Sequence, residues 1–192
     1  MTEKGKKRLG FAVTGSFCTH KAALGVLQTL AENYDIVPVV SEHAAGWDTR
    51  FGTARDLLDG LRALTGREPV LTVTEAETFG PKNPLDLLLI CPCTGNTLAK
   101  LANGITDSAV CMAAKAHLRS DRPLVLAPAS NDAMSANLGN IGTLLARKNV
   151  YFVPMRQDDP LRKPHSLVAD FDRAAEALEA AEKGIQLRPL FP

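Results

Sequence analysis

Short apolar runs alternate along this chain with longer segments whose apolar residues recur every three or four positions. The apolar runs are typical of buried strands and predict strands at residues 9–14, 35–40, 70–73, 85–90, 124–127 and 150–153. The helical spacing predicts helices at residues 19–33, 53–64, 95–101, 109–117, 137–148 and 171–182. This alternation favours an α/β fold with a doubly wound, mostly parallel sheet of the Rossmann or flavodoxin-like kind.

The segments between these elements are polar and are expected to be loops. The longest lie at residues 42–50, 78–84 and 155–167. Residues 1–8 form a polar N-terminal tail, and neither a linker nor an internal repeat divides the rest. We therefore expect a single domain over residues 9–192, which is long enough to bury its own core.

The strand at 85–90 leads directly into the segment Cys91-Pro92-Cys93-Thr94-Gly95-Asn96-Thr97. The side chains of Thr94, Asn96 and Thr97 offer hydrogen bonds where a helix begins. The first amide N–H groups of a helix have no partner within it and attract anions. Because ligands of open α/β sheets bind at this edge, the segment indicates a site for a cofactor that carries a phosphate.

Hydroxyl groups also follow the first two predicted strands. Gly15 and Ser16 occupy the turn after the first strand, and Ser41 ends the second. Hydroxyls at three strand ends around one crevice favour a phosphate or another polar ligand. The turn has one glycine and no Walker lysine, so it lacks the dinucleotide and P-loop fingerprints. The alternative is that these residues form tight turns and cap helices.

A further candidate segment follows the strand at 124–127. Asn131 offers hydrogen bonds to the edge of a planar ring, and Met134 offers a surface that packs on it. The alternative is a helix cap with a core methionine, and without a family argument these residues favour that alternative.

Composition narrows the function classes. A net charge of +1 gives no electrostatic case for nucleic acid or a membrane surface. No apolar run approaches the length of a membrane span, and the polar start of the chain lacks the pattern of a signal peptide. The four cysteines match no zinc-ligand spacing, so we expect reduced thiols and no metal site.

The histidines show no paired spacing. His20, His43, His117 and His165 are each expected to be surface or capping residues, and His43 gains interest only if its loop lines a pocket. Because no acid, base or nucleophile stands out, no residue is predicted to be catalytic, and the chemistry is expected to come from a cofactor.

Two motifs connect the chain to a known family. Thr94-Gly95-Asn96-Thr97 matches an Asn-Thr motif that follows the fourth strand, and residues 99–107 match the pattern after it. A second motif, Pro-x-Met-Asn-x-x-Met-Trp, is partly present at residues 128–135, which keep the proline, the asparagine and the second methionine. On these residues the chain resembles the flavoprotein family of the cysteine decarboxylases and flavin prenyltransferases.

Further loops resemble a narrower group in that family, the B subunits of the dipicolinate synthases of spore-forming bacteria. The shared segments are residues 49–52, 80–82, 84–86, 107–108, 112–116, 131–133, 157–160 and 163–164. The resemblance extends from residue 10 to about residue 190.

The resemblance implies FMN as the cofactor. It implies that the flavin phosphate lies near Gly15, Ser16 and Ser41. It implies that the ring and the ribityl chain lie near Cys93, Thr94, Asn96 and Thr97. Asn131 and Met134 would lie near the ring or the substrate.

The same resemblance implies partners and a reaction. The chain would act with a separate dinucleotide-binding A subunit, which brings NADP(H), to oxidise a dihydrodipicolinate-type substrate to dipicolinate during sporulation. Because the substrate is a small dicarboxylate, Arg50 and Lys82 are the expected cationic anchors. A homo-oligomer built on trimers, up to a dodecamer, is expected in the cytoplasm of the mother cell.

Two departures from the family pattern keep alternatives open. The cysteine decarboxylases carry a catalytic histidine shortly before the fourth strand, but residues 78–83 contain none, and the tryptophan of the second motif is absent. These departures oppose, without excluding, an FMN-dependent decarboxylase of a cysteine derivative; a flavin prenyltransferase ranks lower. A further alternative is a non-catalytic structural or regulatory subunit with a vestigial flavin pocket.

Overall fold

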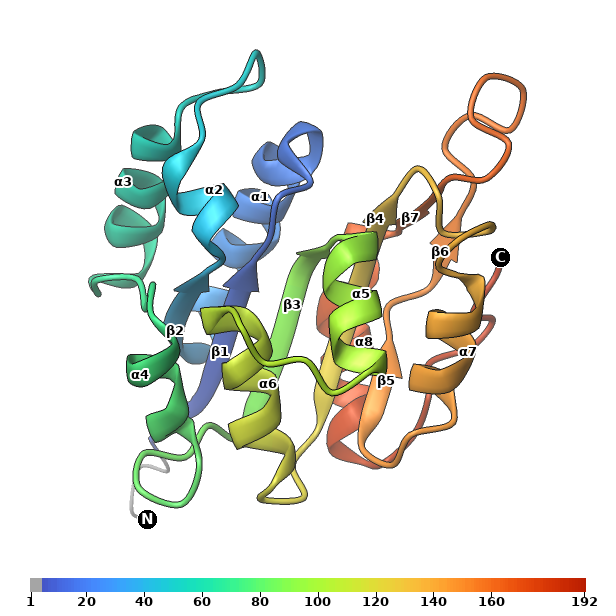
Figure 1. Ribbon diagram of the computed structural model, residues 1–192. Helices are drawn as coiled ribbons and strands as arrows, with labels where there is room; N and C mark the ends of the chain where they lie inside the picture. The colour runs from blue at the N-terminus through green and yellow to red at the C-terminus, as the bar shows by residue number, and fades with distance from the viewer. Residues whose placement is uncertain (1–4) are drawn as a thin grey trace.

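Within residues 5–192, which the computed structural model describes, seven strands form one twisted sheet (Figure 1). The strands are β1 (Lys7–Val13), β2 (Tyr34–Val40), β3 (Leu87–Cys93), β4 (Leu124–Ser130), β5 (Val150–Phe152), β6 (Met155–Arg156) and β7 (Leu167–Ala169). Their order in the sheet is β2-β1-β3-β4-β7-β6, and β5 also pairs with β4.

The large strands all run in parallel. β1 pairs in parallel with both β2 and β3, and β4 pairs in parallel with β3 and β5. The two short strands β6 and β7 form antiparallel pairs at the end of β4. The prediction of a doubly wound, mostly parallel sheet is therefore confirmed.

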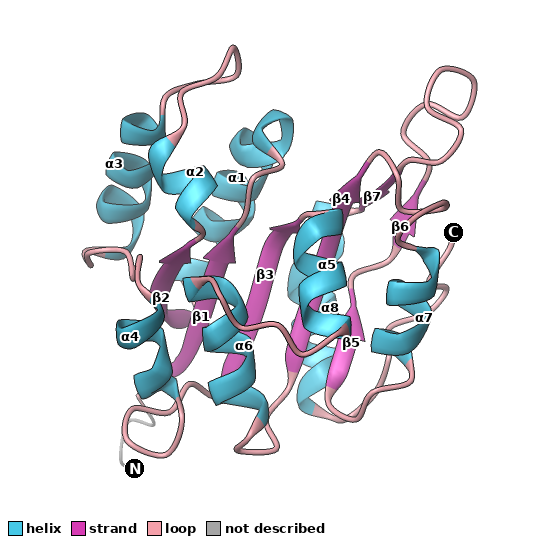
Figure 2. Cartoon of the chain, viewed as in Figure 1, coloured by secondary structure: helices cyan, strands magenta, loops and turns pink. Residues whose placement is uncertain are grey.

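Helices cover both faces of the sheet (Figure 2). They are α1 (His20–Ala31), α2 (Glu42–Gly46), α3 (Ala54–Thr65), α4 (Val73–Ala76), α5 (Gly95–Ala102), α6 (Ala109–Leu118), α7 (Leu138–Leu145) and α8 (Ala174–Glu182), with 3-10 turns η1 (Phe17–Thr19), η2 (Glu77–Phe79) and η3 (Phe171–Arg173). The core on one face is shared by α4, α5, α6 and α7, and that on the other by α1, α3 and α8. Every residue of β3 is buried between the two layers, as expected for a continuous apolar run in a parallel sheet.

The predicted strand at 70–73 is wrong. Val70 alone forms a parallel bridge, to Val39, and α4 begins at Val73. The reason is local: Thr72 and Glu75 form a capping box, which satisfies amide groups at the start of a helix. A helix signal at residues 72–75 therefore overrides the β propensity of the valines.

Two predicted loops contain regular structure. Residues 42–46 form α2, whose buried Ala44 packs against the core that α1 and α3 share. The segment 155–167 starts with β6 and ends with β7, because the polar loop between them folds back and returns to the end of β4. Both elements are too short to produce a clear periodic pattern.

His117 is not the surface or capping residue that the sequence suggested. Its side chain is completely buried in α6, and Nε2 lies 2.8 Å from the carbonyl oxygen of Pro123. Burial lowers the pKa of His117 to about 4. The residue is enclosed because α6 is apolar on most of its surface.

The N-terminal boundary also differs slightly from the expected one. β1 begins at Lys7, which pairs with Tyr34, so the last two residues of the predicted tail belong to the sheet. Residues 1–4 of that tail lie outside the described part of the chain. Among the described residues, no helix is both long and apolar enough to cross a membrane.

Candidate functional site

The candidate site lies at the carboxyl edge of the sheet, where β1 has β2 on one side and β3 on the other. The chain leaves β1 toward β2 and later crosses to β3, so the order reverses at β1. Such a reversal opens a crevice outside the strand ends, and ligands of open α/β sheets bind there. The turns after β1, β2 and β3 all reach this edge (Figure 2).

Thr14 joins the ends of β1 and β3. Its side chain is 1% exposed, and Oγ1 donates a hydrogen bond to the Pro92 carbonyl at 2.7 Å. The same oxygen accepts a hydrogen bond from the Thr94 amide at 3.0 Å. These two bonds fix the turn after β1 against the residues that lead into α5.

The start of α5 is capped by side chains of its own first turn. Thr94 is the N-cap, and its Oγ1 accepts a hydrogen bond from the Thr97 amide at 3.2 Å. The hydroxyls of Thr94 and Thr97 lie 3.0 Å apart. The amides of Gly95 and Asn96 precede the first intrahelical bond, so they stay available to an anion.

A cavity of about 190 Å³ opens at these strand ends, and we call it the strand-end cavity. It is lined by Thr14, Gly15, Phe17, Ser41, Glu42, His43, Trp47, Thr94, Asn96, Thr97, Lys100 and Ser108. Because hydroxyl and amide side chains make up half of this lining, it is suited to a polar anion such as a phosphate.

Two charged residues that line the strand-end cavity, Glu42 and Lys100, are held by contacts with other segments. Glu42 accepts a hydrogen bond from the Ala109 amide at 3.2 Å, which ties α2 to the start of α6. Lys100 forms a salt bridge of 2.8 Å with Asp107. The hydrogen bond between them raises the pKa of Lys100 and lowers that of Asp107, so the lysine keeps a positive charge beside the cavity.

Comparison with known proteins agrees with this geometry. The sequence pattern of the Flavoprotein family matches residues 1–179. The chain belongs to the flavoprotein family. This confirms the resemblance drawn from the Asn-Thr motif, whose residues stand at the start of α5.

Three similar proteins narrow the comparison within the flavoprotein family. It is 43% identical to the B subunit of dipicolinate synthase of Bacillus subtilis (strain 168), over 96% of this chain and 92% of that protein. It is 41% identical to the B subunit of dipicolinate synthase from Bacillus halodurans C, whose crystal structure it matches with a TM-score of 0.89 over 97% of this chain and 96% of the other. It is 27% identical to a dodecameric FMN-dependent UbiX-like decarboxylase from Escherichia coli O157:H7, with a TM-score of 0.62 over 77% and 79% of the two chains.

The structure brings five of the predicted cofactor residues of this flavoprotein together. Gly15, Ser41, Thr94, Asn96 and Thr97 all line the strand-end cavity. His43 also lines the strand-end cavity, so its loop does line a pocket, which was the condition for considering this histidine further.

Two other predicted cofactor residues lie beside the cavity and do not line it. Ser16 forms the turn between β1 and η1, where its carbonyl accepts a hydrogen bond from the Thr19 hydroxyl at 2.8 Å. The Cys93 side chain is completely buried in the core, and burial raises the pKa of its thiol well above the usual range. Cys93 can therefore support the shape of the site but presents no thiolate to a ligand.

Asn131 and Met134 lie in the loop after β4, and both are exposed. This loop rests on the start of α5 at Gly95. A Cβ atom at Gly95 would lie 2.5 Å from the Asn137 Nδ2 and Ser130 Oγ atoms. A larger residue at position 95 would have to displace these side chains, so a glycine suits the close approach of the loop.

The two predicted substrate anchors lie far apart. Arg50 belongs to a projecting segment that we call the finger (residues 47–53), and its guanidinium stands 4.8 Å from the centre of the Phe51 ring. Lys82 precedes β3 and lines a different cavity with Gly80 and Arg119. Since β3 has seven residues, about 20 Å of strand separates Lys82 from the candidate site, and the structure does not bring it there.

Several residues of the site were not predicted from the sequence, among them Phe17, Glu42, Trp47 and Lys100. Lys100 had a usable signal, because it lies four residues after Asn96 and so shares one face of α5 with it. Phe17, Glu42 and Trp47 come from η1, α2 and the finger, so only the folded chain brings them to Asn96.

Proposed function

We propose that this flavoprotein binds FMN in the strand-end cavity and acts as the B subunit of a dipicolinate synthase. The observation that carries the proposal is the Thr94–Thr97 segment, which the Thr14 hydroxyl holds against the turn after β1. The similarity to the B subunits of two dipicolinate synthases supports the assignment to this group.

The residues of the strand-end cavity fit a flavin phosphate and its polar chain. The phosphate would accept hydrogen bonds from the amides of Gly15, Gly95 and Asn96 and from the Ser41 hydroxyl. The ammonium group of Lys100, which Asp107 holds in a salt bridge, offers a further donor on the same side. The exposed aromatic ring of Trp47 offers a stacking surface toward the mouth.

The cavity is too small to enclose a whole flavin. Its volume of about 190 Å³ is below the roughly 300–1,000 Å³ typical of pockets that enclose their ligands. We therefore propose that the ring of FMN extends beyond this chain and is covered by a second copy in a homo-oligomer built on trimers. The dodecameric FMN-dependent relative supports an assembly of this kind.

In the proposed reaction, a dihydrodipicolinate-type substrate is oxidised to dipicolinate. When bound, the flavin would supply an acceptor for the two electrons and two protons that the substrate ring loses. The residues of this chain bind and orient: the strand-end cavity fixes the phosphate, and Arg50 attracts a carboxylate. NADP(H) would reach the reaction only through a dinucleotide-binding A subunit, in the mother-cell cytoplasm of a sporulating bacterium.

Retention of FMN tests the binding half of the proposal. The purified protein is incubated with FMN and desalted, and the flavin absorbance that it keeps is compared with that of two variants. Asn96→Ala should lose the flavin. Asn103→Ala, a matched asparagine at the other end of α5, should keep it. Loss of flavin in both variants, or in neither, would contradict a site at the start of α5.

Reconstitution with the A subunit tests the catalytic half. The pair should oxidise the substrate faster than the A subunit alone, and Asn96→Ala should remove the gain. Equal rates with and without this flavoprotein would favour the non-catalytic alternative. Release of carbon dioxide from a cysteine derivative by this flavoprotein alone would favour the second candidate, an FMN-dependent decarboxylase of a cysteine derivative.

A further inference from the structure

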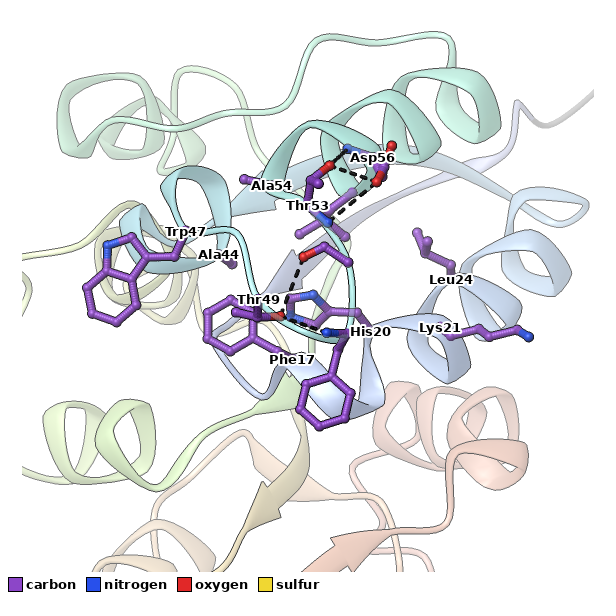
Figure 3. A pocket seen from close by; sticks show the side chains of 13 residues that line it. Phe17, His20, Lys21, Leu24, Ala44, Trp47, Thr49, Thr53, Ala54 and Asp56 are labelled. Carbon is purple, nitrogen blue, oxygen red and sulfur yellow. Dashed lines mark hydrogen bonds between the residues drawn. The ribbon is translucent and has the colours of Figure 1, made fainter.

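A second cavity, of about 150 Å³, lies next to the strand-end cavity and shares Phe17 and Trp47 with it. We call it the finger cavity, because the finger and the start of α3 form one side of it and α1 forms the other. In Figure 3, His20 and Thr49 lie in the middle, with Trp47 and Lys21 on opposite sides.

The walls of the finger cavity are suited to a ring. Phe17, Trp47 and Phe51 contribute three aromatic side chains, and Leu24 and Leu57 contribute aliphatic ones. Trp47 is 56% exposed and Phe51 is 54% exposed, so these large apolar groups stand at an open mouth. An apolar cavity of about 150 Å³ is known to accept a benzene ring, so a six-membered ring fits the space.

His20 provides one polar atom to the finger cavity. Its Nε2 lies 2.8 Å from the Thr14 carbonyl oxygen, which can only accept, so Nε2 carries the hydrogen. Burial lowers the pKa of His20 despite this hydrogen bond, so the ring is neutral near pH 7. Nδ1 is then an acceptor, and it has no hydrogen-bond partner among the residues that the structure describes.

Two cations are associated with the finger cavity: Lys21 lines it, and the Arg50 guanidinium stands over the ring of Phe51, which lines it. Neither Lys21 on α1 nor Arg50 on the finger forms a salt bridge within residues 5–192. Asp56, the acidic residue on the wall, accepts a hydrogen bond of 2.7 Å from the Thr53 hydroxyl in the capping box of α3, which fixes its position without cancelling its charge. The two cations outnumber this one carboxylate of the lining, so the mouth favours an anion.

We propose that the finger cavity binds the ring of a six-membered-ring dicarboxylate, with Arg50 and Lys21 as partners of its carboxylates and His20 Nδ1 as the acceptor for a ring N–H. The aromatic walls supply contact area, and the cations supply charge recognition. The inference rests on the proposed function, since it assigns to the substrate of that reaction a place beside the flavin.

Binding of two probes tests this assignment by calorimetry. Pyridine-2,6-dicarboxylate has both carboxylates but no ring N–H, whereas piperidine-2,6-dicarboxylate has the same carboxylates and a protonated ring nitrogen that donates N–H bonds. Arg50→Gln should weaken both probes about tenfold. His20→Gln keeps an amide donor for the Thr14 carbonyl but removes Nδ1, so it should weaken the piperidine probe about fivefold and leave the pyridine probe unchanged.

Arg55→Gln is the matched control, because Arg55 is also an arginine near the cavity but its side chain is 89% exposed on α3. It should bind both probes like the unaltered protein. Failure of both probes to bind, or equal effects of Arg50→Gln and Arg55→Gln, would overturn the proposal. Flavin retention is measured on the same samples. Retained flavin without probe binding refutes the finger cavity alone, and probe binding without flavin refutes the proposed cofactor alone.

Discussion

The strand-end cavity and the finger cavity lie side by side and are built in opposite ways. Apart from the shared Phe17 and Trp47, the first has many short polar residues at the ends of β1, β2 and β3, where buried hydrogen bonds such as those of Thr14 hold the turns in place. The second is made of large, half-exposed side chains on α1 and the finger. The strand-end cavity is suited to the phosphate of a cofactor, and the finger cavity is suited to the selection of a substrate by its ring.

This difference has a physical basis. A phosphate needs donors at fixed positions, and strand ends in a parallel sheet are positioned by the whole hydrogen-bonded ladder. The finger is held by local contacts, such as the bridge between Thr49 and Gly52, so it can change in sequence without disturbing the sheet. Mutations in the strand-end cavity should therefore lower the free energy of unfolding more than mutations in the finger do.

The largest effect is expected from Thr14→Val, which keeps the shape of the side chain but removes Oγ1. The Pro92 carbonyl and the Thr94 amide then lose their partner in a buried place. The free energy of unfolding should fall by about 2–6 kcal/mol, since each of these two unsatisfied groups costs about 1–3 kcal/mol. Chemical denaturation measures the loss, and the affinity for FMN should fall about tenfold or more.

Two variants serve as controls for the prediction on Thr14→Val. Thr14→Ser retains the hydroxyl and should retain most of the stability. Thr29→Val removes an exposed hydroxyl on α1 and should change the free energy of unfolding by less than about 0.5 kcal/mol. If Thr14→Val were as stable as Thr29→Val, the strand-end cavity would not depend on the buried hydrogen bonds.

A smaller effect is expected from pH, and it arises outside both cavities. The pKa of His117 is about 4 in the folded protein and 6.5 as a free side chain, so the unfolded state binds the proton more readily. Stability should be fully present above pH 6.5 and decline as the pH falls toward 4. From pH 7 to pH 5 the loss attributable to His117 is about 2 kcal/mol.

Denaturation curves of the unaltered protein and of His117→Gln check this. The glutamine can still donate to the Pro123 carbonyl but does not titrate, so its curve should be flatter between pH 7 and pH 5. A variant with the same pH dependence as the unaltered protein would show that other groups control acid stability. Comparisons of the two cavities are best made above pH 7, where this contribution is constant.

The smallest effect on stability is expected from Phe51→Ala. Because Phe51 is 54% exposed on the finger, the free energy of unfolding should change by less than about 0.5 kcal/mol. The affinity for pyridine-2,6-dicarboxylate should nevertheless fall several-fold. Leu161→Ala, at a residue that is 94% exposed in a distant loop, should change neither quantity. A large loss of stability in Phe51→Ala would show that the two cavities do not differ in their contribution to the free energy of unfolding.

Much of the fold followed from the sequence, because buried strands of a parallel sheet are continuous apolar runs. β1, β2, β3 and β4 were all anticipated within a few residues. The errors fall on short elements such as α2 and α4, whose local capping signals compete with propensity. The residues at strand ends that line the strand-end cavity were also anticipated, since the edge at which parallel strands end is fixed by their direction.

The sequence by itself determined the alternation of strands and helices, the hydroxyls at three strand ends and the family motif at Thr94–Thr97. These features are local, so their spacing along the chain is enough to reveal them. The tertiary structure alone decided that the Thr14 hydroxyl bonds to residues 78 and 80 positions away, that Lys82 lies at the opposite edge and that Arg50 stands beside a cavity of the size of a ring. Those relations depend on the order of the strands in the sheet, which no local pattern contains.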